Sequence, residues 1–300
     1  MKKRKSLIAL LFAFIMLGTA ASFAACNDSP TADLHPDSEQ VSPLPDDGDS
    51  ADSSDGSNSA NGSNGSDGSA SGGSSDTVVT PQQPATPVVQ KAQYIRCTSD
   101  SVNIRSGAGT EYSVLGSAEK GTSYAVLGKT GNWYKTYYRG KTAYIYASYA
   151  SVFTLEKTSD AETEAVITEG YKLIGVPYVY GAIRVHNGKG KLLSGFTAQK
   201  FDCSSLVQYV FYKGAGKLLD MNTRTQIKQG KYVHPNDLQR GDCIFFTNED
   251  RQYNTGIERV GHVAIYLGNN YILHTASDYA RIEKMSSQRW SFYIEARRFL

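Results

Sequence analysis

The sequence predicts an α+β fold in which a small all-β region precedes a region of mixed helices and strands. Residues 92–153 contain short runs rich in Val, Ile, Tyr and Thr, separated by glycines, a pattern typical of a small β barrel. Helix-start signals follow at residues 159 and 202. Two apolar, strand-like runs then flank a Gly-Asn-Asn turn at 268–270. These segments predict two folded regions.

The N-terminus has the features of an export signal. Residues 2–5 are all basic, residues 7–17 are apolar, and small residues lead to Cys26. A cysteine directly after two alanines resembles the lipobox of bacterial lipoproteins, which implies removal of residues 1–25 and lipidation of Cys26. Simple cleavage near Ala24 and an uncleaved membrane anchor are the alternatives. All three place the folded regions outside the cytoplasm.

Residues 26–91 are predicted to form a disordered tether. Residues 46–76 contain only Asp, Ser, Gly, Asn and Ala, so they cannot bury enough apolar surface to offset the entropy of ordering. The whole chain carries +2, the signal contributes four positive residues and the tether eleven acids, so residues 91–300 carry +9. A basic exported head favours anionic wall polymers or peptide carboxylates as partners. The export signal argues against nucleic acid.

The mixed region, residues 158–300, opens with a predicted helix. Ser159 begins an S-x-x-E capping box, and Gly175 and Pro177 end the helical pattern. A glycine- and lysine-rich loop follows over residues 182–200. This loop is long for a compact domain, which indicates that it is either functional or mobile.

A second predicted helix begins at a cysteine. Asp202 is a favoured N-cap, so Cys203 lies in the first turn, where backbone N–H groups and the helix dipole stabilise a thiolate. Apart from Cys26, the chain has three cysteines, an odd number that indicates a candidate nucleophile. Cys97 and Cys243 are expected in the core. The alternative for Cys203 is a buried thiol behind an ordinary cap.

Two histidines are predicted on one face of the hairpin around the 268–270 turn. If those three residues form the loop, Leu267 pairs with Tyr271 and Ala264 with His274, which makes His262 a neighbour of His274 on the same face. A two-residue loop is expected to place the histidines on opposite faces.

Cys203, His262 and His274 match the needs of thiol catalysis, namely a nucleophile, a base and a group that orients the base. The same three side chains are also possible zinc ligands. Zinc binding predicts sensitivity to chelators, whereas thiol catalysis predicts sensitivity to iodoacetamide. His186 and His234 are expected to be solvated.

Five motifs carry a family resemblance over about residues 160–300. They are, in order, PYVYG, FDCSSLVQYVF, LQRGDCIFF, GHVAIYLGNN and ILHTAS. Together they resemble the NlpC/p60 family of cell-wall cysteine peptidases. The resemblance implies a papain-like α+β domain that needs no cofactor or metal and hydrolyses the bond after γ-D-glutamate in peptidoglycan stem peptides.

The resemblance also implies roles for individual residues. Cys203 matches the nucleophile, His262 the base and His274 the orienting third residue. Tyr178 matches a tyrosine that helps to stabilise the oxyanion. Asp202 and Ser204 match a pair that contacts substrate beside the nucleophile.

Residues 92–153 resemble a bacterial SH3-like domain through their NIRSG, KG and GNWYK segments. That resemblance implies binding to the cell wall or to stem peptides. The expected protein is therefore an exported, tethered peptidoglycan endopeptidase of the cell envelope, acting as a monomer on peptidoglycan or muropeptides. The alternative is a non-catalytic wall-binding lipoprotein that keeps the peptidase fold.

Overall fold

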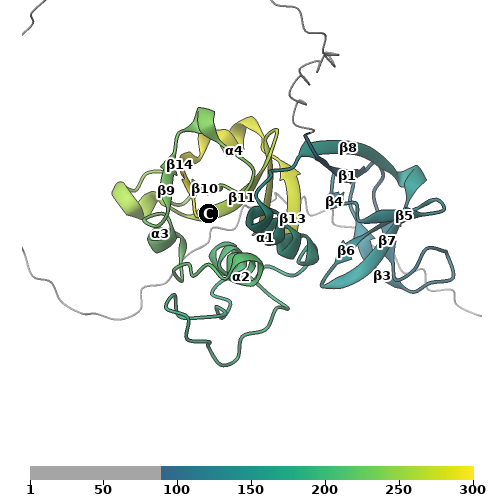
Figure 1. Cartoon of the computed structure of the whole chain (residues 1–300), viewed down its shortest axis with the longest axis horizontal. Helices are drawn as coiled ribbons and strands as arrows, with labels where there is room; N and C mark the ends of the chain where they lie inside the picture. Colours follow the sequence, from purple (N-terminus) through teal and green to yellow (C-terminus); the bar gives the residue numbers. More distant parts are fainter. Residues whose placement is uncertain (1–88) are drawn as a thin grey trace, which may run out of the picture. The chain divides into compact units, whose positions relative to one another are not determined.

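The computed structural model describes residues 89–300, which fold into two β-sheets and a set of helices (Figure 1). The predicted signal, the predicted lipidation site Cys26 and the tether up to residue 88 lie outside the described residues. No helix within residues 89–300 is long and apolar enough to cross a membrane.

The smaller sheet has five antiparallel strands and belongs to the SH3-like region. In spatial order these are β3 (Val114–Ala118), β2 (Val102–Arg105), β7 (Lys141–Tyr146), β6 (Trp133–Tyr138) and β5 (Gly128–Thr130). A short 3₁₀ turn, Ala147–Tyr149, follows β7. Left-handed Gly131 and Gly140 sit at the turns on either side of β6, as the spacing of glycines predicts.

The larger sheet has nine antiparallel strands and runs through both regions. Its spatial order is β8 (Ala150–Glu156), β1 (Lys91–Cys97), β4 (Ser123–Ala125), β13 (Tyr279–Lys284), β12 (Tyr271–Ala276), β11 (His262–Gly268), β10 (Cys243–Phe246), β14 (Tyr293–Arg298) and β9 (Lys231–Val233). Because β4 pairs with β13 at Ser123 and Ile282, the SH3-like strands divide between two sheets. The SH3-like region is all-β, as the sequence predicts, and its strands within residues 89–300 are shared between the two sheets without forming a closed barrel.

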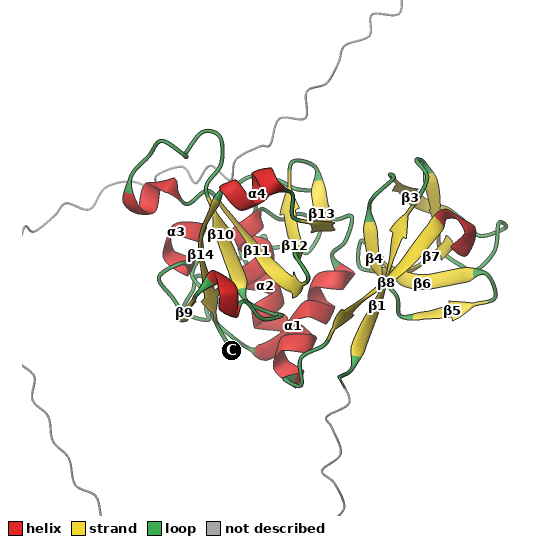
Figure 2. Cartoon of the chain, turned by 90° about the horizontal axis from the view of Figure 1, so that it is seen from above, coloured by secondary structure: helices red, strands yellow, loops and turns green. Residues whose placement is uncertain are grey.

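Within residues 89–300, four α-helices accompany the larger sheet (Figure 2). They are α1 (Ala161–Lys172), α2 (Cys203–Ala215), α3 (Thr223–Gln226) and α4 (Ser287–Ser291). The helix α1 packs against α2, and α2 packs against β11 and β12. Loop 182–200 contains no helix or strand, and its backbone bridges itself at His186 and Leu192.

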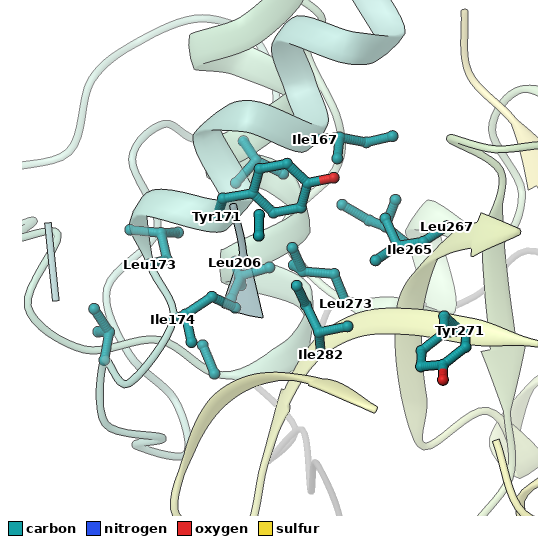
Figure 3. Close-up of a cluster of buried hydrophobic side chains, with 14 of the residues drawn as sticks. Ile167, Tyr171, Leu173, Ile174, Leu206, Ile265, Leu267, Tyr271, Leu273 and Ile282 are labelled. Atoms are coloured by element: carbon teal, nitrogen blue, oxygen red, sulfur yellow. The ribbon is translucent and has the colours of Figure 1, made fainter. Parts of the chain in front are cut away.

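The main hydrophobic core lies between these helices and one face of the sheet. Side chains such as Ile167 and Tyr171 of α1 meet Leu206 of α2 and Leu273 of β12 (Figure 3). A smaller apolar cluster contains Ile244 and other residues that alternate with those of the main core. Because apolar side chains contact both faces, all four residues of β10 are buried, which explains its continuous apolar sequence.

A buried polar network joins the SH3-like region to the first helix. The hydroxyl of Tyr94 on β1 contacts that of Tyr171 on α1. Arg240 donates to both hydroxyls, at 3.0 and 2.8 Å, and its Nε lies 2.6 Å from the carboxylate of Glu164. This network and the shared sheet connect the two regions as parts of one compact unit.

Two local expectations from the sequence are wrong. The first helix is capped by Asp160 rather than Ser159, because its carboxylate accepts from the backbone N–H of Thr163 at 2.9 Å. His186 is buried rather than solvated. Its Nδ1 accepts from the N–H of Gly188, and its ring packs edge-on against Tyr212.

Candidate active site

Cys203 is the first residue of α2 and is buried. Asp202 caps this helix, accepting from the N–H of Ser205 at 2.8 Å, while the Ser205 hydroxyl accepts from the N–H of Asp202 at 2.9 Å. This reciprocal capping box fixes the helix start at Cys203. The sulfur-bearing side chain of Cys203 is thus attached at the positive end of the helix dipole, as predicted from the Asp-Cys-Ser-Ser sequence.

Three backbone pairings bring the start of α2 to one end of the large sheet. Pro177 bridges Tyr279, the first residue of β13, and Tyr178 bridges Phe201, two residues before Cys203. The start of β13 is adjacent to the end of β12, where Ala276 pairs with Tyr279. Because β11 runs antiparallel to β12, this end of the sheet is also where β11 begins with His262.

The hairpin between β11 and β12 has the predicted strand register, although its turn differs from the predicted one. Ile265 pairs with Leu273 and Tyr266 with Ile272, as the predicted register requires, but Gly268 then pairs with Tyr271. The turn therefore contains only Asn269 and Asn270, both with positive φ, of 49° and 64°. One extra residue in β11 forms a bulge, which offsets the shorter turn and returns both histidines to the same face.

The two histidines are in direct contact. Nε2 of His262 lies 2.9 Å from Nδ1 of His274, and the rings meet nearly edge to face at 81°. His262 also packs against Phe246, with ring centroids 6.0 Å apart. Both histidines are buried, at 5% and 1% exposed. The contact holds the His262 ring in one orientation, which a general base requires.

The surroundings favour neutral imidazoles. Burial lowers the pKa of His262 well below its usual value, and His274 and Arg289 lower that pKa further. Burial also lowers the pKa of His274, although the carboxylate of Glu283 opposes this effect. A neutral imidazole can accept a proton, so this environment suits a base.

Sequence reasoning missed two charged residues beside this pair. Oε1 of Glu283, on β13, lies 3.3 Å from Nε2 of His274 and 3.0 Å from a guanidinium nitrogen of Arg289. Burial alone would raise the pKa of Glu283. The contact with His274 and the charges of the nearby arginines have a larger effect and hold this pKa far below its usual range. The only available signal was the position of Glu283 nine residues after His274, at the spacing of the next hairpin.

Asp202 and Ser204 form a polar cluster with a residue of the long loop. Arg184 reaches both side chains, with one nitrogen 2.9 Å from Asp202 Oδ2 and 3.1 Å from Ser204 Oγ. The hydroxyl of Ser204 also donates to Asp202 Oδ1 at 3.1 Å. Arg184 was not singled out from the sequence. Tyr178 is half-buried in the segment that bridges Phe201.

The other cysteines and histidines are separate from this cluster. Cys97 and Cys243 are buried free thiols, as predicted, and burial raises the pKa of Cys97 to about 11. His234 is exposed, as predicted. Among residues 89–300, no group of three or more His, Cys, Asp or Glu side chains is arranged to hold a metal ion.

A groove of about 680 Å³ lies in the SH3-like region. One part of its lining is aromatic, with ring centroids of Trp133 and Tyr146 5.1 Å apart and those of Tyr146 and Tyr149 6.0 Å apart. Charged side chains also line the groove, namely Asp100, Arg105 and Glu111. Aromatic rings beside charges of both signs suit a ligand with apolar faces and polar groups.

Comparison with known proteins identifies both regions. Residues 175–298 match the NlpC/P60 family, and residues 100–151 match the bacterial SH3 domain. The chain therefore carries an NlpC/P60 domain of mixed helices and strands, preceded by a bacterial SH3 domain.

Curated relatives of this chain include a gamma-DL-glutamyl hydrolase and a peptidoglycan endopeptidase. A gamma-DL-glutamyl hydrolase of Bacillus subtilis (strain 168) is 35% identical over 126 residues, which cover 42% of this chain and 26% of that protein. The peptidoglycan endopeptidase RipB of Mycobacterium tuberculosis (strain CDC 1551 / Oshkosh) is 32% identical over 119 residues, 40% of this chain and 45% of RipB. The chain thus spans less than half the length of these relatives.

Among solved structures, an NlpC/P60 family protein from Bacillus cereus ATCC 10987 is similar with a TM-score of 0.37 and 21% identity, covering 70% of this chain and 64% of that one.

Proposed function

We propose that this chain is a cysteine endopeptidase that cleaves peptidoglycan stem peptides after γ-D-glutamate. The observation that carries the proposal is the 2.9 Å contact between His262 and His274 at the sheet end where α2 begins with Cys203. The relatives that are peptidoglycan endopeptidases support the substrate class, and the gamma-DL-glutamyl hydrolase supports the type of bond.

In the proposed mechanism His262 accepts the thiol proton of Cys203, and the thiolate attacks the carbonyl carbon of the scissile bond. The backbone N–H of Cys203 and the hydroxyl of Tyr178 stabilise the oxyanion. The imidazolium of His262 then protonates the departing amine, which leaves an acyl-enzyme. Water activated by His262 hydrolyses the thioester and restores the thiol. His274 holds the ring of His262 throughout.

Asp202 and Ser204 shape the substrate site beside the nucleophile in this proposal. Asp202 is 1% exposed and is held by Arg184 and by the backbone of α2. Its direct contribution is therefore to fix the start of the helix, while Ser204 and Arg184 present hydrogen-bonding groups next to Cys203.

A second function, wall binding, is favoured by the groove of the SH3-like region. Its aromatic rings offer stacking surfaces, and its charged groups match the carboxylates and amines of wall peptides. The +9 charge of residues 91–300 also favours the anionic polymers of an envelope. We place the protein outside the cytoplasm as a monomer, held at the membrane by a lipid on Cys26.

The decisive experiment is digestion of defined muropeptides by the chain from residue 26 to 300, followed by mass spectrometry. The wild type is expected to release products ending in γ-D-glutamate, and Cys203→Ala to release none while still binding sacculi. Cys97→Ala removes a buried cysteine outside the site and is the matched control, expected to retain activity. Equal cleavage by Cys203→Ala and the wild type would contradict the assignment of Cys203 as the nucleophile.

The same digest separates the two alternatives. A non-catalytic wall-binding protein predicts binding without any cleavage by the wild type. Zinc bound by Cys203, His262 and His274 predicts loss of activity with a chelator, whereas the thiol mechanism predicts loss with iodoacetamide and none with the chelator.

A further inference from the structure

Glu283 lies on the side of His274 that is remote from His262. His274 uses Nδ1 to meet His262 at 2.9 Å, and its other nitrogen, Nε2, faces Glu283 Oε1 at 3.3 Å. Glu283 is in turn fixed by Arg289 of α4 at 3.0 Å. His262, His274 and Glu283 therefore form a row of contacting side chains, one from each of the strands β11, β12 and β13.

The chemistry of these three side chains determines which nitrogen of each histidine donates a hydrogen bond and which accepts one. An ionised carboxylate only accepts hydrogen bonds, so the nitrogen of His274 that faces Glu283 carries the ring proton. A neutral imidazole then has its lone pair on Nδ1, which accepts a hydrogen bond from the N–H at Nε2 of His262. His262 consequently keeps its own lone pair on Nδ1, the nitrogen that can take a proton from a thiol.

Within residues 89–300, the charged side chains that act on the pair come from β13 and α4. Glu283 and Arg281 project from β13, and Arg289 projects from α4, where its guanidinium also lies over the ring of Phe246. Glu283 is the single anionic side chain among these groups that contacts either histidine in the described part of the chain. It therefore offsets the arginines when an imidazolium forms.

We propose that Glu283 is a positioning residue of the active site, which fixes the tautomers of His274 and His262 and stabilises the imidazolium formed during catalysis. The proposal rests on the function proposed above. Glu283 does not touch the substrate or the thiol; it acts through His274. Removing its charge is expected to make the Cys203 thiolate harder to form, because its counterion, the His262 imidazolium, loses its compensating anion.

The test compares Glu283→Gln with Glu295→Gln in the chain from residue 26 to 300. Glu295 is a matched control, since it is a partly exposed strand carboxylate paired with an arginine, Arg297, and does not contact the histidines. The rate of iodoacetamide alkylation is followed against pH on the reduced protein, by mass spectrometry of the peptide that contains Cys203. This measurement requires no substrate.

Glu283→Gln is expected to raise the midpoint pH of Cys203 alkylation by about one unit. It is also expected to lower kcat by roughly 10- to 100-fold with little change in KM. Glu295→Gln is expected to change neither value. An alkylation midpoint in Glu283→Gln equal to that of Glu295→Gln would overturn the proposal.

Arg289→Gln gives a second test, in which the midpoint pH of Cys203 alkylation is expected to shift in the opposite direction. Removing this cation favours the imidazolium, so the alkylation midpoint is expected to fall, whereas a merely structural role predicts no directed shift. If Glu283→Gln does not fold, as judged by circular dichroism, Arg289→Gln decides alone, and an unchanged or higher midpoint overturns the proposal. If the midpoints shift as expected but the wild type cleaves no muropeptide, the positioning role stands and the endopeptidase function fails.

Discussion

His262 and His274 are twelve positions apart and on different strands, yet Nε2 of the first lies 2.9 Å from Nδ1 of the second. The pair is buried, and the environment disfavours protonation of either ring. Burial of the two histidines therefore has a consequence for the stability of the protein.

We expect the protein to lose stability as the pH falls below about 6.5, the usual pKa of histidine in an unfolded chain. The folded-state pKa values of His262 and His274 are lowered, so the unfolded chain binds these protons first and unfolding becomes more favourable on acidification. Each histidine contributes up to about 1.4 kcal/mol per pH unit in this window. Chemical denaturation at pH 7 and pH 5 measures the difference.

The control for this pH effect is a histidine exchange at two sites. His262→Gln is expected to reduce the pH dependence of the unfolding free energy, because one buried imidazole is gone. His234→Gln changes an exposed histidine and is expected to leave the pH dependence of the unfolding free energy as it is in the wild type. Equal pH dependence in all three proteins contradicts this explanation.

The SH3-like region and the NlpC/P60 domain are expected to unfold in a single calorimetric transition. Arg240→Ala leaves Glu164, Tyr94 and Tyr171 without their shared cation in a buried network, which is expected to cost about 3–5 kcal/mol. Arg259→Ala removes an exposed arginine and is expected to cost less than about 0.5 kcal/mol. Two separate transitions, or an unchanged Tm in Arg240→Ala, would show that the network does not couple the regions.

The aromatic side of the SH3-like groove is expected to bind the wall. Tyr149→Ala removes a ring that lines the groove and is 48% exposed, so it is expected to weaken sacculus binding about tenfold, as loss of an aromatic contact does. Tyr253→Ala removes a more exposed tyrosine that does not line the groove. Co-sedimentation with purified sacculi compares the two variants. Equal weakening by both points to a general effect of aromatic surface.

The ion pair between Asp202 and Arg184 is expected to hold the long loop against the start of α2. Asp202→Asn retains a good helix cap but removes the charged carboxylate that the largely buried guanidinium of Arg184 contacts at 2.9 Å, at a cost of about 2–4 kcal/mol. Asp160→Asn makes the same change at the exposed cap of α1 and is expected to cost less than about 1 kcal/mol. Urea titrations of both variants give the two values. Similar losses in both would mean that capping alone accounts for the effect.

Local features of the site follow directly from the sequence. The Asp-Cys-Ser-Ser segment predicts a helix that begins at Cys203, and it does so because capping depends on residues within one turn. The loop assumed at residues 268–270 predicts the hairpin register that the structure has, with Ile265 opposite Leu273. The turn itself was predicted wrongly, since the Gly-Asn-Asn segment allows either a three-residue loop or a two-residue turn with a bulge, and both preserve the faces.

The sequence by itself thus determined the local elements, the shared face of the two histidines and the family resemblance, because each depends on neighbouring residues or on a periodic pattern. Only the tertiary structure decided that Glu283 lies beside His274, that Arg184 reaches Asp202, and that β4 pairs with β13. These contacts join segments whose pairing is set by packing across the whole sheet, and no short-range preference of the chain specifies them.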